Sequence, residues 1–246
     1  MSDAPKENTF ARADVAGGCA PWLSFFLQSN DTFFPTGSYA HSFGLEGLAQ
    51  AGLVTDRSSL REFVFASTLP SLQRNDLPIA AHAWRAFGEK DWARLGQLSI
   101  LASSLKTAKE ARFAAENIGR QRAELCATLH ESDLARTYLQ NLQAGGWPPH
   151  ANISVALEAR VFAAPLDAAL VSVFYSSVAG LLAAAMKLLR IGQNGAQSLL
   201  TEAMASAPAV IAAAQTISFE EIGWFNPWLD IAAARHETAD ARLFIS

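Results

Sequence analysis

The chain has 246 residues, a formal net charge of −4, and 50% hydrophobic residues against 17% charged ones. This length and apolar content can fill one sizeable hydrophobic core, and the acidic balance without a basic cluster argues against a nucleic-acid-binding surface. The alanine-rich composition predicts an all-α fold, which we expect to be a single-domain bundle of about ten helices around a central apolar helix.

Residues 1–20 are mostly polar and contain a Gly-Gly pair near their end, so we expect a flexible segment before a helical domain at 21–246. The first residues lack the basic and apolar regions of a signal peptide. The two cysteines, Cys19 and Cys126, form no Cys-x-x-Cys pair. We therefore expect a cytoplasmic protein whose cysteines are reduced.

The most distinctive stretch is residues 28–52, where a Pro-Thr-Gly turn precedes a short helix. Pro35 and Gly37 suit a type II β-turn, because proline fixes φ and glycine tolerates a positive φ. Ser38 can cap the following helix. We expect that helix to end at Gly52, with this glycine in the left-handed conformation.

Two glycines, Gly44 and Gly47, lie inside this expected helix. An interior glycine costs about 1 kcal/mol of helix stability relative to alanine, so the pair indicates close approach of another backbone. That backbone can belong to this domain, as tight helix packing, or to a partner that uses this face as a contact surface.

A capping signal and two prolines divide the next part of the chain. Ser59 and Glu62 have capping-box spacing at the start of a helix, and we expect Pro70 to end that helix. Pro78 falls inside the following apolar pattern, which predicts a kink or a break there. His82 lies near the same face, and we interpret it as structural because a metal site needs several converging ligands.

Apolar stripes then predict helices over 91–105 and 132–142, and a highly charged helix is expected between them over 106–130. The mixed charges of the middle one are expected to form mostly a solvated face. The run Gly-Gly-Trp-Pro-Pro at 145–149 breaks the helical pattern. We expect no domain boundary there, because each half alone would leave an apolar face uncovered.

The last third begins with an expected helix at 165–191, which has no charged residue from 168 to 186. That run is close to the length of a membrane span, but its many alanines and hydroxyl residues favour the central helix of a bundle. A further helix is expected over 195–216, split or kinked at Pro208. The aromatic segment 219–228 is expected to plug the bundle, with contact to a partner as the alternative.

The common catalytic signatures are missing from the sequence: the phosphate-binding loop, the dinucleotide fingerprint, the zinc-protease motif and the nucleophile elbow. His41, Ser42 and Glu46 lie close together, but a catalytic triad also needs an oriented base and an oxyanion site. The sequence therefore carries little that indicates catalysis.

Three groups of residues share their order and spacing with one known family. The first is Phe34-Pro35-Thr36-Gly37-Ser38-Tyr39 with His41-Ser42-Phe43-Gly44-Leu45-Glu46. The second is Gly192-Gln193 with Gln197, and the third is Asp230-Ile231 and Arg235-His236-Glu237 followed by Arg242-Leu243-Phe244. In this order they resemble the urease accessory protein UreF family over nearly the whole chain.

The resemblance implies an all-α chaperone that helps activate apo-urease by assembling its nickel metallocentre. It also implies a protein that is not an enzyme and that has no cofactor or metal site of its own, and the lack of catalytic signatures agrees with this role. UreF proteins bind the accessory protein UreD, also called UreH, and help recruit the GTPase UreG. The family also tends to dimerise. The implied partners are therefore UreD/UreH, UreG, apo-urease through the accessory complex, and a second copy of this chain, with no nucleic acid and no membrane.

The resemblance assigns partner binding to its first and last motifs, at Tyr39, His41, Glu46, Arg235, His236, Glu237, Arg242, Leu243 and Phe244. Arg242 is the strongest single candidate, because a guanidinium can make bidentate bonds to a partner carboxylate. The tail after Glu237 is expected either to dock on a partner or to pack on its own bundle. Many relatives carry Leu-Tyr-Ser before this arginine, and the chain lacks that tyrosine.

Two other functions are compatible with the sequence. A GTPase-activating regulator of UreG would supply an arginine to the transferred phosphoryl group, and faster GTP hydrolysis in a mixture of the two proteins would identify it. An independent helical-bundle enzyme would need a cofactor in its core. Colour or bound metal in the purified protein would identify that alternative.

Overall fold

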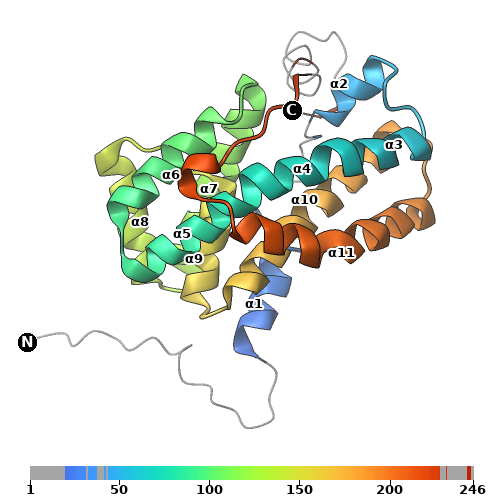
Figure 1. The fold of residues 1–246 in the computed structure, drawn as a ribbon. Helices are drawn as coiled ribbons and strands as arrows, with labels where there is room; N and C mark the ends of the chain where they lie inside the picture. Colours follow the sequence, from blue (N-terminus) through green and yellow to red (C-terminus); the bar gives the residue numbers. More distant parts are fainter. Residues whose placement is uncertain are drawn as a thin grey trace, which may run out of the picture.

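The structure is a computed structural model, and the residues that it describes are 20–31, 33–37, 42, 44–227, 231 and 243–244. Within these residues the chain is helical without a β-strand (Figure 1), which confirms the expected all-α class. The expected flexible segment, residues 1–20, lies outside them except for Ala20. The elements in chain order are α1 (Pro21–Ser29), α2 (Leu45–Gln50), α3 (Arg57–Phe63), the π-helical turn η3 (Val64–Thr68), α4 (Leu69–Ser71), the π-helical turn η4 (Leu72–Asp76), α5 (Leu77–Glu89), α6 (Trp92–Ser104), α7 (Lys109–Leu129), α8 (Asp133–Gly145), α9 (Ala151–Val161), α10 (Leu166–Leu188), α11 (Gln193–Gln215) and the short 3₁₀ helix η5 (Phe219–Glu221).

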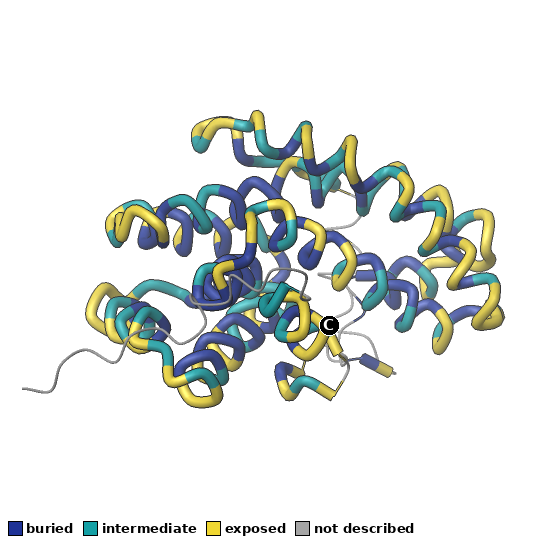
Figure 2. Tube along the Cα trace, turned by 90° about the horizontal axis from the view of Figure 1, so that it is seen from below, coloured by how far each residue is buried: buried dark blue, intermediate teal, exposed yellow. Residues whose placement is uncertain are grey.

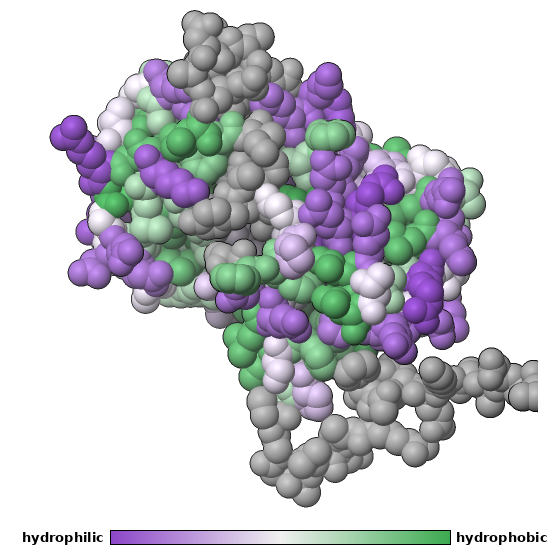
Figure 3. Space-filling model, turned by 180° about the vertical axis from the view of Figure 1, so that it is seen from behind, coloured by the Kyte–Doolittle hydropathy of each residue, from purple (hydrophilic) through white to green (hydrophobic). Residues whose placement is uncertain are grey.

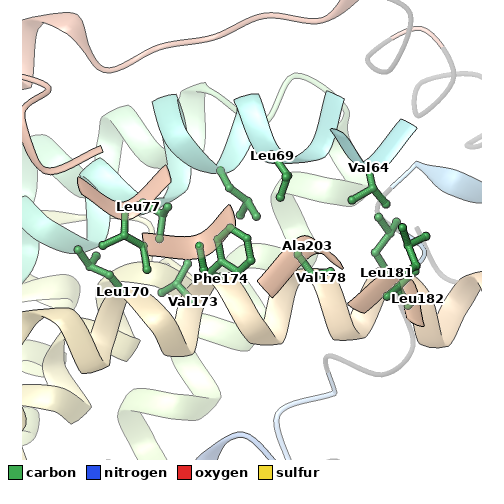
Figure 4. Close-up of a cluster of buried hydrophobic side chains, with 14 of the residues drawn as sticks. Val64, Leu69, Leu77, Leu170, Val173, Phe174, Val178, Leu181, Leu182 and Ala203 are labelled. Atoms are coloured by element: carbon green, nitrogen blue, oxygen red, sulfur yellow. The ribbon is translucent and has the colours of Figure 1, made fainter. Parts of the chain in front are cut away.

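Helix α10 runs through the bundle, as its composition predicts. In the close-up (Figure 4), Leu170, Val173 and Phe174 of α10 face Leu69 and Leu77 across the core. By length and composition alone α10 could cross a membrane, since its most apolar window has a mean hydropathy of 1.9, but 56% of that window is buried. Seen from below (Figure 2), buried residues lie along the inward sides of the helices, as in a packed bundle.

Residues 57–89 form one continuous helical element, here called the long rod, from α3 through α5. The expectation that Pro70 ends a helix is therefore wrong. Of the kink or break expected at Pro78, the break is also wrong. In an α-helix a proline ring collides with the carbonyl group four residues earlier. Each proline here follows a π-helical turn, η3 or η4, whose wider spacing moves that carbonyl away.

The long rod begins at a capping box three residues earlier than expected. Asp56, rather than Ser59, is the N-cap residue of α3. Its Oδ1 accepts a hydrogen bond from the Ser59 N–H at 2.8 Å, and the Ser59 hydroxyl accepts one from the Asp56 N–H at 3.1 Å. Aspartate is as well suited to the N-cap position as serine, so Asp56 takes the role that we expected for Ser59. Ser59 in turn takes the third helical position, which we expected Glu62 to occupy.

The two halves of the chain share their core, as expected. The break after α8 is confirmed, with Gly146 at a φ of 62°. Helix α9 lies beyond this break and packs against both α5 and α7 from before it. Trp22 and Trp84 pack against both clusters of buried hydrophobic residues.

Helix α11 is a single helix with Pro208 inside it, so the expectation of two separate pieces is wrong. Its buried positions keep helical spacing on both sides of the proline, at Ala203, Ala207, Ile211 and Ala214. A proline inside a helix costs about 3 kcal/mol. Burial of one continuous apolar face offsets that cost.

Candidate functional site

The first and last sequence motifs meet at the carboxylate of Glu46. This residue lies in the first turn of α2 and is 3% exposed. Its Oε1 accepts a hydrogen bond from the Leu243 backbone N–H at 2.7 Å, and its Oε2 accepts one from the Phe244 N–H at 3.0 Å. Hydrogen bonds to an ionised acceptor are among the stronger ones in proteins. Glu46 therefore ties the end of the chain to α2.

The two tail residues beside Glu46 differ in their exposure. Phe244 is buried, and the Lys187 ammonium of α10 lies 5.2 Å from its ring centroid, within range of a cation–π contact. Leu243 is 61% exposed. Of the two alternatives for the tail, packing on its own bundle holds for Phe244, whereas the Leu243 side chain is presented to solvent.

The turn before α2 lies against α7. The Thr36 N–H donates to the Phe34 carbonyl oxygen at 2.8 Å, and Gly37 has a φ of 74°. The positive φ is confirmed, but this bond closes a tighter turn than the type II turn that we expected. Oriented as a donor, the Gln121 side-chain amide lies 2.7 Å from the Thr36 carbonyl oxygen and 3.1 Å from that of Pro35.

Helix α2 is shorter than expected, because it begins after Gly44. This glycine is the N-cap residue and has a φ of 83°, a left-handed conformation that suits glycine, so it does not lie inside the helix. Gly52 follows the helix with a φ of 70°, which confirms the expected left-handed end. Near the start, the Glu46 N–H donates to the hydroxyl oxygen of Ser42 at 3.5 Å, whereas the expected cap, Ser38, lies outside the described residues.

A buried ion pair joins α7 to α9 beside the same turn. Arg122 and Glu158 are 6% and 2% exposed, and the Arg122 Nη2 donates to the Glu158 Oε2 at 2.5 Å. The Arg122 Nη1 also donates to the Ser29 carbonyl at 3.2 Å, and its guanidinium lies 5.8 Å from the Phe34 ring centroid. The expected solvated face of α7 therefore does not include Arg122, which instead connects α1, α7 and α9.

A second polar cluster lies where α9 begins. The Asp76 Oδ1 accepts hydrogen bonds from the Lys106 Nζ at 3.0 Å and from the Asn152 Nδ2 at 2.8 Å. His150 is the N-cap residue of α9, and burial together with the nearby Lys106 lowers the pKa of its imidazole to about 3. His150 is therefore neutral at physiological pH and serves as a helix cap.

Residues 217–226, here called the C-terminal strap, run back along the long rod after α11 (Figure 1). The His82 Nε2 lies 3.0 Å from the Ile217 carbonyl oxygen, so His82 holds the start of the strap. Further along, the Gly223 N–H donates to the Arg74 carbonyl oxygen at 3.1 Å. That oxygen is available because the residue four positions later, Pro78, has no N–H.

The rest of the strap is also held by polar groups of the π-helical turns. The Asn75 Nδ2 donates to the Trp224 carbonyl oxygen at 3.1 Å. The Asn226 Nδ2 donates to the Ser67 hydroxyl at 3.0 Å. The expected plug at 219–228 holds only for the start of the segment, because Ile222 is buried and Phe219 packs against the same hydrophobic cluster, whereas Phe225 is largely exposed. Trp228 lies outside the described residues.

Of the predicted partner-binding residues, the structure describes Glu46, Leu243 and Phe244, and it brings these together. The others lie outside the described residues: Tyr39, His41, Arg235, His236, Glu237 and Arg242. Their assignment to partner binding stays a prediction.

The structure also shows neighbours that the sequence analysis did not single out, namely Gln121, Arg122, Glu158 and Lys187. The one available signal was Glu158, a carboxylate in an otherwise apolar stretch of α9. In the part of the chain that is described, no three histidine, cysteine or acidic residues come together as metal ligands. Cys126 is buried, and burial raises the pKa of its thiol, which disfavours the reactive thiolate.

Comparison with known proteins matches this chain to one family. The model of the family described as UreF matches residues 54–204. "Urease accessory protein UreF" of Azoarcus sp. (strain BH72) is 30% identical over 233 residues, which cover 94% of this chain and 98% of that protein. The protein of the same name from Paenarthrobacter aurescens (strain TC1) is 29% identical over 89% of this chain and 96% of that protein. The one from Bacillus sp. (strain TB-90) is 27% identical over 91% of this chain and 98% of that protein.

Proposed function

This chain belongs to the UreF family of urease accessory proteins, and we propose that it binds the accessory protein UreD/UreH in the cytoplasm and helps recruit the GTPase UreG to apo-urease. Its relatives are named as accessory proteins of an enzyme, and the chain is accordingly an accessory protein rather than an enzyme. Nickel is the cargo in this proposal. It passes to urease, so the proposal requires no resident metal site in this chain.

The observation that carries the proposal is the meeting of the two motif regions at Glu46. These regions are 197 residues apart in the sequence, yet the Glu46 carboxylate holds the backbone of Leu243. A partner that docks on the exposed Leu243 side chain therefore also lies next to α2. One contact surface built from both motifs explains why the same chain carries both.

We expect Leu243→Asp to weaken capture of purified UreD/UreH by about tenfold, because an exposed apolar side chain at an interface is replaced by a carboxylate that must lose its water. A titrated pull-down measures this. The matched control is Leu129→Asp, since Leu129 is also well exposed but lies at the end of α7. Undiminished capture by Leu243→Asp, with capture by the control intact, would count against docking at the tail.

Recruitment of UreG is tested on the captured complex. With UreD/UreH bound to the wild-type chain, UreG and GTP are added and the retained UreG is measured. Retention of UreG supports recruitment. Faster GTP hydrolysis by UreG in the presence of this chain alone would instead support the alternative of a GTPase-activating regulator.

We also propose that the chain forms a homodimer through exposed apolar side chains of α10. Val171 and Tyr175 lie one helical turn apart on this helix and are both exposed. Beside them, Ser172 exchanges hydrogen bonds with Asn30, which follows α1. Figure 3 shows that hydrophobic patches lie among hydrophilic residues on the rear face of the bundle.

Tyr175→Asp is expected to convert the dimer to a monomer, because two carboxylates would be brought into one apolar interface. Light scattering coupled to size exclusion measures the mass. Ile100→Asp is the control, since Ile100 is an exposed apolar residue of α6. A mass that stays that of a dimer in Tyr175→Asp would exclude this face, and a monomeric wild-type chain would exclude the dimer.

A further inference from the structure

We infer that Glu46 is a positioning residue, which fixes the C-terminal tail for docking and does not itself contact the partner. The inference rests on the proposed function, since the partner is the UreD/UreH protein. Glu46 is almost fully buried, and each of its carboxylate oxygens accepts a backbone N–H of the tail. Its position leaves it little surface to offer to another protein.

The geometry of the two hydrogen bonds determines which side chain of the tail faces outward. One carboxylate holds the N–H groups of two consecutive residues, which fixes the rotation of the backbone at Leu243 and Phe244. With that rotation, the Phe244 ring is buried near Lys187 and the Leu243 side chain is exposed. Because the bonds go to backbone groups, Glu46 sets this orientation whichever side chains the tail carries.

The chain is also fixed on the other side of the tail. The C-terminal strap is hydrogen-bonded to the long rod through Gly223, Trp224 and Asn226. Residues 217–226 and residues 243–244 are therefore both attached to the same bundle. Attachment of Leu243 and Phe244 orders these two residues before the partner arrives, which lowers the entropic cost of binding.

Hydrogen exchange tests the attachment without any partner. In the wild-type chain we expect the amides of Leu243 and Phe244 to exchange slowly, because both donate to Glu46. Glu46→Gln keeps the shape of the side chain but replaces one acceptor oxygen with an amino group, which would face a backbone N–H. We expect exchange of the two amides to become about tenfold faster in this variant, and mass spectrometry of the C-terminal peptide measures it.

Two further variants keep the test decisive. Glu202→Gln removes a carboxylate from the exposed surface of α11 and should leave exchange at the C-terminal peptide unchanged. Phe244→Ala removes the buried ring and leaves Glu46 intact, so the amide of Leu243 should still exchange slowly, and this variant tests the role of Glu46 even if Glu46→Gln fails to fold. Exchange at the tail that is equally fast in the wild-type chain and in Glu46→Gln would overturn the inference.

Capture of UreD/UreH then separates the inference from the proposed function. We expect Glu46→Gln to weaken capture by about tenfold with faster tail exchange, and Leu243→Asp to weaken capture with tail exchange unchanged. Capture that is undiminished in a Glu46→Gln chain with a released tail would refute the positioning role. Absence of capture by the wild-type chain would refute the proposed function, while the exchange experiment would still decide whether Glu46 holds the tail.

Discussion

Replacing Arg122 with methionine is expected to lower the free energy of unfolding by about 3–5 kcal/mol, because it leaves the Glu158 carboxylate buried without its partner. Burial raises the pKa of Glu158, and the charge and hydrogen bond of Arg122 lower it. Without the arginine, only the hydrogen bond with the Ser29 side chain still opposes the effect of burial on this pKa, and the carboxyl group is expected to take up a proton. The Ser29 carbonyl also loses its donor, so the end of α1 is expected to loosen. Urea denaturation at neutral pH measures the loss.

Two controls show whether burial is the cause. Arg61→Met removes the arginine of an exposed ion pair with Glu202, and it should leave the urea midpoint nearly unchanged. The double variant Arg122→Met/Glu158→Gln removes the stranded charge and should recover a large part of the loss. Equal losses in Arg122→Met and Arg61→Met would contradict the interpretation of Arg122 as a buried connector of helices.

Gly119→Ala is expected to lower the free energy of unfolding by about 2–3 kcal/mol, because it overpacks the contact between α7 and the start of α9. A Cβ atom at position 119 would lie 2.4 Å from the carbonyl carbon of His150 and 2.6 Å from its nitrogen. Both are backbone atoms, so the start of α9 must move. The same shift would strain the bond from the Ser154 hydroxyl to the Gly119 carbonyl oxygen, which measures 2.7 Å. Thermal and urea denaturation measure the effect.

The matched control is the same substitution within α11. At Gly195 the nearest atom to an added Cβ is the Arg57 Cδ at 4.0 Å, so alanine has room there. Gly195→Ala should raise the free energy of unfolding by about 0.5–1 kcal/mol, because alanine restricts the unfolded chain and favours the helix. Opposite signs for the two substitutions are expected. Destabilisation by both would show that helix packing at Gly119 is not the cause.

The helices that sequence analysis predicted correctly are those whose signal is local. Apolar residues at 3.6-residue spacing predicted α6 and α8, and an uncharged alanine-rich run predicted α10, whose inner face is buried. Gly52 is a second local case, since a glycine after a short helical pattern predicts its left-handed end. Each of these features depends on residues within a few positions of one another.

The features that sequence analysis missed depend on contacts between residues that are far apart in the sequence. The pair Arg122 and Glu158 joins two helices, and no spacing within either helix indicates it. The bonds from the tail to Glu46 likewise have no local pattern. Pro70 and Pro78 look like helix ends locally, but tertiary packing of the long rod keeps it helical by widening the preceding turns.

Pro78 affects how the C-terminal strap aligns with the long rod. Inside a regular helix every carbonyl oxygen is already bonded to an N–H of the next turn, so a chain lying alongside finds no acceptor. Arg74 is different, since its oxygen is bonded by Gly223. A strap shifted by one residue along the rod would move the Gly223 N–H away from that oxygen, so the acceptor freed by Pro78 favours the observed register of residues 217–226, much as a partner strand does in a sheet.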